Sequence, residues 1–138
     1  MTRTLMIIKP DAVSRNLVGE IIRRVESEGF QVVEMKMIRL SRSQAGEFYA
    51  VHTERPFYCG LLDFMTSDRV VPVVLERDDA VSYLRQVIGN TDQAKAEPGT
   101  IRKDMASSVQ KNAVHASDSP ENAQKEIAFF FGSEASAR

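Results

Sequence analysis

A single histidine within a short polar run is the first candidate for chemistry in this sequence. His115 lies in residues 112–119, whose small and hydroxylic side chains leave room for a reactant to approach it. An imidazole held neutral by a carboxylate or a hydroxyl acts as a nucleophile or a general base. Ser117 and Glu126, the latter about two turns into the helix predicted to follow, are candidates for that orienting role. The spacing alone leaves open an alternative, in which His115 is a polar loop residue that takes part in no reaction.

Basic and hydroxylic side chains that suit phosphate oxygens form a second candidate group, Lys9, Arg85, Thr91 and Arg102. Guanidinium groups offer forked donors to phosphate, and a threonine hydroxyl adds one more donor. Lys9 stands at the end of the first predicted strand, where its charge can reach into a cleft. The alternative is a solvated basic face, which is the preferred interpretation for Lys95 and Lys103.

No established phosphate or metal motif accompanies these residues. The sequence contains neither a Gly-x-x-x-x-Gly-Lys-Ser/Thr loop nor a Gly-x-Gly-x-x-Gly turn, which argues against a Walker-type or Rossmann-type phosphate cradle. No cluster of cysteine and histidine has the spacing of metal ligands, and the isolated His52 is interpreted as a surface residue. A Mg²⁺ ion held mainly by substrate phosphates would leave little trace in a sequence.

An aromatic residue after a break in the chain offers a stacking surface. Phe57 follows Arg55 and Pro56, and Leu61, one helical turn further on, would extend the same apolar wall. The alternative is that Phe57 is a core aromatic that packs on a helical neighbour.

Length and composition indicate an ordinary globular protein. The chain has 138 residues, enough for one domain (residues 1–138) that buries its own core. A net charge of −1 gives no general attraction to nucleic acid or to an anionic membrane. No apolar run approaches the length of a membrane span, and the N-terminal segment is charged too soon for a signal peptide. The single cysteine, Cys59, excludes an internal disulfide and is expected to be a small, partly buried residue in a cytoplasmic protein.

Apolar periodicity predicts the elements that must position these side chains. Strands are expected at residues 4–8, 31–39, 70–75 and 113–114, and helices at 17–28, 41–52, 58–65, 79–87 and 120–130. The stretch 89–111 has no clear period and is expected to be a long loop, a feature that is often functional. Ser119 and Pro120 form a strong helix start, so His115 is expected between the last strand and the last helix.

This order of elements is βαββαβ with additional helices. It predicts a ferredoxin-like α+β fold, in which helices pack on one face of a four-stranded antiparallel sheet.

Five stretches of the sequence resemble the nucleoside diphosphate kinase family over nearly the whole chain. They are Ile8-Lys9-Pro10-Asp11-Ala12-Val13, residues 17–22, Arg55-Pro56-Phe57, residues 98–102 and, most specifically, Asn112-Ala113-Val114-His115-Ala116-Ser117-Asp118-Ser119. The resemblance implies a ferredoxin-like fold and a ping-pong reaction. A nucleoside triphosphate would give its γ-phosphoryl group to a histidine, and a nucleoside diphosphate would then remove it, with Mg²⁺ accompanying the nucleotide and little selection among bases.

The resemblance also implies a role for each candidate residue. His115 would be the phosphorylated nucleophile, with Ser117 and Glu126 fixing its ring. Lys9, Tyr49 and Asn112 would meet the ribose and the phosphates, with Tyr49 also near the histidine. The phosphate ligands would be Arg85, Thr91 and Arg102. Phe57 would stack on the base, faced across it by Val109, with Leu61 extending the wall.

The chain departs from the family pattern at several positions. Ala116 replaces the usual Gly after the histidine, which requires a backbone conformation that Ala tolerates. Gln93 replaces the usual Pro of the long loop, which puts the packing of that loop in question. Arg77 stands where Gly is common, and Pro72 is unusual within a strand because it removes one ladder donor.

The edge strand and the resemblance together predict a homodimer, or a homotetramer made of two dimers, and not a hexamer. Strand 31–39 alternates like an uncovered sheet edge, which invites pairing with a second copy, and helix 18–28 would flank that pairing. Hexamers of the family use the long loop and often a C-terminal extension, whereas here Gln93 replaces the loop Pro and the chain ends at Arg138. Glu134 would disfavour burial of the tail between dimers.

Two other classes of protein fit the predicted fold. A ferredoxin-like RNA-binding module would need aromatic residues on the open sheet face and a basic stripe, but strands 5–8 and 70–75 contain no aromatic residue. A catalytically silent assembly protein on the same scaffold would have no need of the intact set Lys9, Arg85, Arg102, Asn112 and His115.

Overall fold

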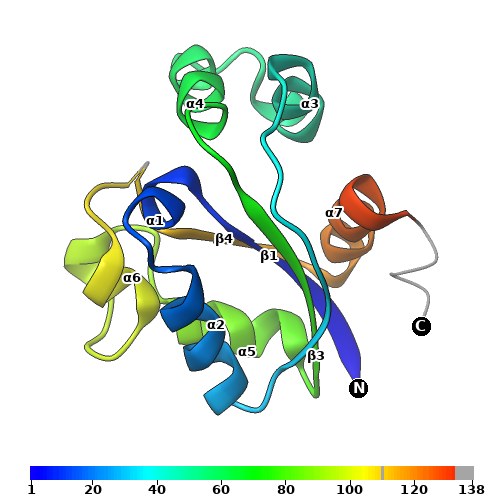
Figure 1. Cartoon of the computed structure of the whole chain (residues 1–138), viewed down its shortest axis with the longest axis vertical. Helices are drawn as coiled ribbons and strands as arrows, with labels where there is room; N and C mark the ends of the chain where they lie inside the picture. Colours follow the sequence, from blue (N-terminus) through cyan, green and yellow to red (C-terminus); the bar gives the residue numbers. More distant parts are fainter. Residues whose placement is uncertain (110, 133–138) are drawn as a thin grey trace.

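The computed structural model describes residues 1–109 and 111–132, and its centre is a four-stranded sheet (Figure 1). The strands are β1 (Thr2–Ile8), β2 (Gln31–Met35), β3 (Val71–Arg77) and β4 (Val114–Ala116). They lie in the order β2-β3-β1-β4, and each neighbouring pair is antiparallel. This is the ferredoxin-like α+β fold that the sequence predicts. Glu134 lies outside the described residues.

Helices cover both faces of this sheet. They are α1 (Pro10–Ser14), α2 (Val18–Ser27), α3 (Arg42–Phe48), α4 (Tyr58–Met65), α5 (Ala80–Ile88), α6 (Ile101–Met105) and α7 (Pro120–Phe131), with 3-10 turns η1 (Ala50–His52) and η2 (Gln93–Lys95). One core cluster packs α2, α5 and α6 against one face, and a second packs α3, α4 and α7 against the other. The prediction that helices cover one face is therefore wrong. Unbroken apolar runs such as residues 5–8, which are fully buried, are typical of strands covered on both sides.

Pro72 has no backbone N–H to donate, and the interior strand β3 tolerates it because of the direction in which that N–H would have pointed. Its carbonyl accepts the N–H of Lys36 at 3.2 Å. The N–H and C=O of one strand residue point to the same neighbour, so the lost donor falls on the β2 side. There β2 has already ended at Met35, and the ladder loses little.

Strand β2 lies at the edge of the sheet, as predicted, but it is shorter than expected. Its pairing with β3 shifts register between Val32 and Glu34, and beyond Met35 only an isolated bridge joins Ile38 to Val70. This irregularity breaks the alternation that residues 31–39 suggest. Met35 and Met37 remain exposed at this edge.

The last strand, β4, ends two residues later than predicted. Strand β4 contains His115 at its middle, opposite Ile7 of β1, instead of ending before it. The segment is too short for its alternation to be visible in the sequence. Helix α7 begins as predicted, with the Ser119 hydroxyl accepting the Asn122 N–H at 3.1 Å.

Local capping gives order to the stretch that was expected to be a long loop. The Asp92 carboxylate accepts the Ala94 N–H at 3.0 Å at the start of η2, and the Thr100 hydroxyl accepts the Lys103 N–H at 3.2 Å at the start of α6. Gln93 donates its side-chain amide to the Lys103 carbonyl at 2.9 Å. The loop is therefore tied to α6 without the usual Pro.

Three residues noted in the sequence, Pro10, Arg77 and Cys59, have the following surroundings in the structure. Pro10 occupies the first position of α1, where its missing N–H has no helical partner to lose. Arg77 lies over the Tyr83 ring at 3.6 Å from its centroid. Cys59 is exposed in the first turn of α4, so the prediction that it is partly buried is wrong. Over the described residues, no helix combines the length and apolar character needed to cross a bilayer.

Candidate active site

One cavity of about 460 Å³ beside β4 collects residues from distant parts of the chain. Most of the residues proposed from the sequence line it: Lys9, Tyr49, Phe57, Arg85, Thr91, Arg102, Val109, Asn112, His115 and Glu126. Pairing of β4 with β1 brings the end of one strand beside the start of the other, where the Lys9 N–H donates to the Ala113 carbonyl at 2.9 Å. The sheet therefore assembles residues that are far apart in sequence.

The ring of His115 is held by a carboxylate and a hydroxyl, as proposed. Its Nε2 lies 2.8 Å from Oε1 of Glu126, and the Ser117 hydroxyl donates to the same oxygen at 2.6 Å. A carboxylate that accepts from Nε2–H leaves the lone pair of the neutral imidazole on Nδ1. Phe48 packs edge-on against the ring, with centroids 5.5 Å apart. His115 is thus a half-buried imidazole with a fixed orientation, and its Nδ1 suits a nucleophilic role.

Two arginines are anchored to the backbone on either side of the histidine. Arg102 donates from Nη2 to the Val114 carbonyl at 2.9 Å, and Arg85 donates from Nη1 to the Ala116 carbonyl at 3.3 Å. Because these carbonyls flank His115 in β4, the two cations are positioned relative to the same strand as the nucleophile.

Arg102 is the more buried of the two cations. Its Nη1 also donates to the Gly89 carbonyl at 3.1 Å and to the Thr91 hydroxyl at 3.4 Å. Burial, together with the nearby Arg85 charge, lowers the pKa of Arg102 to about 10, so it remains protonated at neutral pH. Its Nε is buried and has no hydrogen-bond partner among the described residues.

Lys9 and Asn112 form a buried polar pair at the base of the cavity. The Lys9 ammonium donates to Oδ1 of Asn112 at 2.9 Å, and the Asn112 amide donates to the Val109 carbonyl at 2.9 Å. Burial, and secondly the Arg102 charge, lower the pKa of Lys9 to about 8, against the opposing effect of Asp11.

Tyr49 brings a second unsatisfied polar atom to the cavity. Its hydroxyl is buried and has no hydrogen-bond partner within the part of the chain that the structure describes. Burial, with the Glu126 charge adding to it, raises the pKa of Tyr49 above its ordinary value. It therefore stays a hydroxyl donor, and together with Arg102 Nε it would be satisfied by a ligand rich in oxygen.

Three exposed apolar side chains, Val51, Phe57 and Val109, stand at the cavity mouth. The ring of Phe57 packs on His52, with centroids 5.5 Å apart. Leu61 is not among the lining residues and packs against the second core cluster instead. Its expected place in the stacking wall is therefore wrong, because the α4 turn carries it toward the sheet.

Sequence reasoning missed several lining residues, among them Phe48, Asp118 and Asn122. The signal for Phe48 was its place beside Tyr49, and for the other two it was their spacing of one helical turn across the Ser119 cap. The Asn122 amide donates to Oδ1 of Asp118 at 2.6 Å. This bond, the largest influence, lowers the pKa of the Asp118 carboxyl.

The donor set fits a divalent metal that arrives with a phosphate ligand. No group of three or more His, Cys, Asp or Glu side chains within residues 1–109 and 111–132 is arranged to hold a metal ion by itself. Glu126 is already engaged by His115 and Ser117, whereas Asp118 is exposed at the cavity mouth. An ionised carboxylate of this kind suits a Mg²⁺ ion whose other ligands are phosphate oxygens and water.

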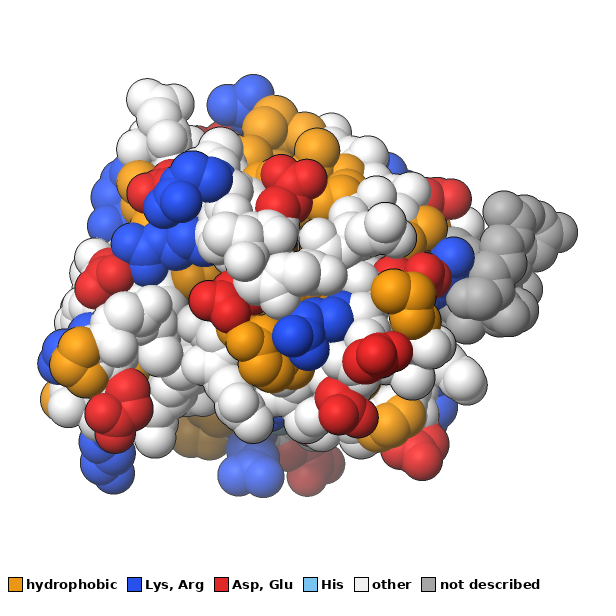
Figure 2. All heavy atoms as spheres, turned by 90° about the horizontal axis from the view of Figure 1, so that it is seen from below, with side chains coloured by type: hydrophobic (Ala, Val, Ile, Leu, Met, Phe, Trp, Pro, Cys, Tyr) orange, Lys and Arg blue, Asp and Glu red, His pale blue; other side chains and the backbone are white. Residues whose placement is uncertain are grey.

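The arrangement as a whole suits transfer of a phosphoryl group to nitrogen. It combines an oriented imidazole, buried cations and an aromatic platform in one cavity. It does not suit an RNA-binding sheet, because both sheet faces are covered by helices. On the face shown in Figure 2, Lys and Arg side chains are interspersed with Asp and Glu instead of forming a basic stripe.

Comparison with known proteins gives a consistent result. A family model described as nucleoside diphosphate kinase matches residues 2–136. The chain is similar to the nucleoside diphosphate kinase of Nitratiruptor sp., with 57% identity over 131 residues that cover 95% of this chain and 96% of the relative. It is also similar to that of Wolinella succinogenes, with 58% identity and the same coverage.

Solved structures agree with these relatives. A crystal structure of nucleoside diphosphate kinase from Aquifex aeolicus superposes with a TM-score of 0.91 and 49% identity, covering 94% of each chain. An apo structure of nucleoside diphosphate kinase from Encephalitozoon cuniculi superposes with a TM-score of 0.94 and 38% identity, covering 98% of this chain and 92% of the other.

Proposed function

The chain belongs to the nucleoside diphosphate kinase family and is a phosphotransferase that acts on nucleotides, and we propose that it works by a ping-pong mechanism through phosphohistidine at His115. The observation that carries the proposal is the contact of Nε2 with Glu126 at 2.8 Å. It leaves Nδ1 as the nitrogen with the free lone pair inside the cavity.

In the first half-reaction, Nδ1 of His115 attacks the γ-phosphorus of a nucleoside triphosphate. The bond between that phosphorus and the β,γ-bridging oxygen breaks as the N–P bond forms, and the nucleoside diphosphate leaves with the bond's electron pair. The positive charge that develops on the ring is balanced by the Glu126 carboxylate through Nε2–H. In the second half, a terminal phosphate oxygen of another nucleoside diphosphate attacks the same phosphorus, and His115 is regenerated.

Positioned cations lower the barrier of each half-reaction. Phosphoryl transfer passes through a loose transition state, so catalysis depends on alignment and on neutralising charge at the oxygens. Arg85 and Arg102, each anchored to β4, together with Lys9 supply that charge. A Mg²⁺ ion bound with the nucleotide would neutralise further phosphate charge beside Asp118.

Low selectivity among bases is part of the same proposal. The apolar residues at the cavity mouth, Phe57 and Val109, offer faces for stacking. A stacked base is held by its π-face, which every base possesses, and not by the hydrogen-bonding edge that distinguishes one base from another.

A two-step labelling experiment tests the mechanism. The protein is incubated with ATP labelled on its γ-phosphate, freed of nucleotide, and then mixed with unlabelled GDP. We expect label on the protein after the first step and labelled GTP after the second. Transfer that occurs only when both nucleotides are present together, with no labelled protein, would contradict a ping-pong reaction.

We predict that Phe57→Ala raises KM for all nucleotides by a similar factor while the preference among bases stays nearly flat. Loss of base stacking is worth roughly 1–3 kcal/mol per base in single-strand binders. Steady-state kinetics with adenine, guanine and cytosine nucleotides measure the effect, and Phe57→Trp, which keeps a stacking face, is the control. A loss confined to one base would contradict the stacking account.

We predict that kcat/KM falls as the pH rises through about 8, because Lys9 then loses its proton and its positive charge. The profile of kcat/KM reports the free enzyme, in which burial lowers this pKa. Lys9→Met should be less active below that pH and should lack this descending limb. If kcat/KM of Lys9→Met still falls with the same midpoint pH, the titration belongs to another group.

Assembly as a homodimer, or as a homotetramer of two dimers, is proposed from the exposed edge strand β2. Met35 and Met37 stay exposed there, and an unpaired edge invites pairing with a second copy. Light scattering coupled to size exclusion is expected to give the mass of two or four chains. Met35→Lys should weaken the assembly, whereas Val51→Lys, a change at an exposed apolar residue elsewhere, should not. A mass of one or six chains for the unmodified protein would contradict the proposal.

Two further expectations complete the proposal. The chain is taken as one domain over residues 1–138, which is supported by the match of the family model to residues 2–136. A cytoplasmic location stays a prediction from the single cysteine.

A further inference from the structure

The turn that leads into β4 is strained. Ala113 has a φ of 73°, in the left-handed region that residues with a Cβ rarely adopt. The Asn112 carbonyl accepts the Val114 N–H at 2.8 Å across it. A hydrogen bond from residue i to residue i+2 around a positive φ defines a γ-turn of the rare, strained kind. Such a conformation persists only where its surroundings hold it.

This turn separates two groups of the active site. Asn112, on one side of it, accepts the Lys9 ammonium at 2.9 Å. On the other side, the pairing with β1 begins at Val114, and His115 lies opposite Ile7. If the turn relaxed, the amide and the imidazole would change their relative positions, although neither side chain had been altered.

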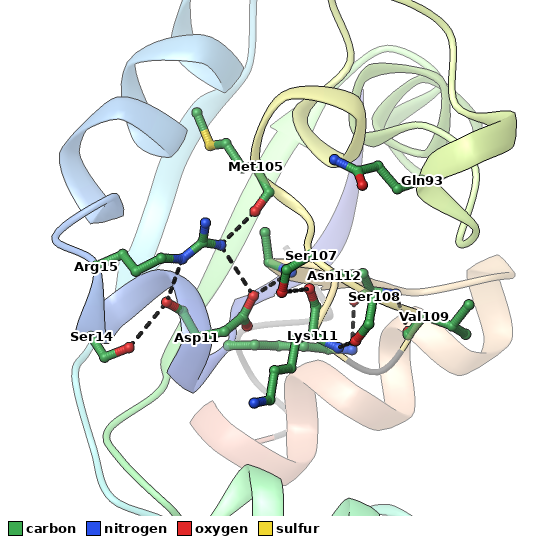
Figure 3. Close-up of polar contacts among 12 residues, drawn as sticks. Asp11, Ser14, Arg15, Gln93, Met105, Ser107, Ser108, Val109, Lys111 and Asn112 are labelled. Atoms are coloured by element: carbon green, nitrogen blue, oxygen red, sulfur yellow. Dashed lines mark hydrogen bonds and ion pairs between the residues drawn. The ribbon is translucent and has the colours of Figure 1, made fainter.

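A buried carboxylate outside the cavity holds the turn. Oδ2 of Asp11 accepts the Ala113 N–H at 3.1 Å, and the Asp11 side chain is 7% exposed. The same oxygen lies 3.4 Å from Nη2 of Arg15, which also donates to the Met105 carbonyl at the end of α6. Figure 3 shows Arg15 reaching from α1 toward both of these partners. Arg15 therefore holds the carboxylate in place and is itself bound to the end of α6.

We propose that Asp11 is a positioning residue for phosphoryl transfer. Its carboxylate holds the γ-turn at Ala113, and this turn fixes the position of Asn112 relative to His115. The role rests on the function proposed above. Asp11 is not among the residues that line the nucleotide cavity, so it acts through the turn and not by contact with substrate.

The experiment uses a double-mutant cycle between the carboxylate and the turn. Gly adopts a positive φ without a steric cost, so Ala113→Gly removes the need for a clamp. The rate of phosphoenzyme formation is measured by rapid quench for wild type, Asp11→Ala, Ala113→Gly and the double variant. Asp11→Ala should be at least about tenfold slower than wild type, and the double variant should be within about threefold of Ala113→Gly.

The control is Asp104→Asn, which removes an exposed carboxylate that also pairs with an arginine, Arg24, at 2.8 Å. It should label at the wild-type rate. If Asp11→Ala does not fold, Asp11→Leu takes its place in the cycle, because Leu fills the space of the carboxylate but offers no acceptor to the Ala113 N–H. Either variant should also shift the midpoint of the fall in kcat/KM to lower pH, since the Asp11 charge raises the pKa of Lys9.

The outcomes separate the two proposals. Normal labelling of wild type with an unchanged rate in Asp11→Ala would overturn the positioning role alone. An equal loss from Asp11→Ala in the wild-type background and in the Ala113→Gly background would do the same, because it would show that the carboxylate and the turn act independently. A wild-type protein that takes no label would overturn the phosphohistidine mechanism and this role with it.

Discussion

The His115→Ala variant is expected to take no phosphoryl label from ATP and to lose nucleotide exchange activity. In the proposed mechanism His115 is the nucleophile, and its Nε2 is engaged by Glu126, whose carboxylate Ser117 also binds. Removing the acceptor removes the covalent intermediate, and with it both half-reactions. The measurement is the amount of labelled protein after brief exposure to γ-labelled ATP, with the rate of phosphate exchange between nucleotides as the second readout.

The chemistry of the label provides an independent check on His115. A phosphoramidate on histidine should be lost in acid and kept in base, which a phosphoserine at Ser117 would not do. His52→Ala is the matched control, because it removes the other histidine of the chain from the same cavity, and it should still be labelled. Label that survives acid, or that persists in His115→Ala, would show that another residue accepts the phosphoryl group.

Replacing Arg102 by Lys should lower kcat/KM by about 100-fold, the scale on which loss of one oriented donor to a charged transition state is felt. A Lys ammonium keeps the charge but not the planar fork. Arg102 donates from Nη2 to the Val114 carbonyl, and its buried Nε, which has no partner among the described residues, is proposed to bind a phosphate oxygen. One ammonium cannot reproduce both arrangements.

Steady-state kinetics and thermal unfolding together distinguish this effect from simple destabilisation of the protein. Arg24→Lys is the control, because Arg24 binds the exposed Asp104 carboxylate and does not line the cavity. It should retain activity. If Arg102→Lys stays within a few-fold of wild type while folding normally, charge alone suffices and the proposed role of the guanidinium geometry is wrong.

Much of the secondary structure could be predicted because it depends on local chemistry. Helix α7 begins where Ser119 and Pro120 require it to begin, and α4 runs over the predicted residues 58–65. Cap residues and apolar periods act over only a few neighbouring positions, so the chain reveals them directly. The prediction failed where the signal was short, as in β4, or where an apolar run fits several environments.

The candidate site was predictable in its residue types and not in its geometry. A histidine with small neighbours and a later carboxylate indicated a nucleophile, and the arginines indicated a phosphate. Nothing local indicated that Leu61 would turn toward the core or that Phe48 would contact the His115 ring. Those facts depend on the angle at which a helix crosses the sheet.

From the sequence alone came the order of the elements, the ferredoxin-like class and the chemical identity of the candidate residues, because each follows from side-chain types and short spacings. Only the tertiary structure decided which ring nitrogen of His115 is free, that helices cover both faces of the sheet, and that Asp11 reaches the Ala113 turn. These features join positions far apart in the chain. Their distances are set by strand register and by packing of the whole core, which no local pattern encodes.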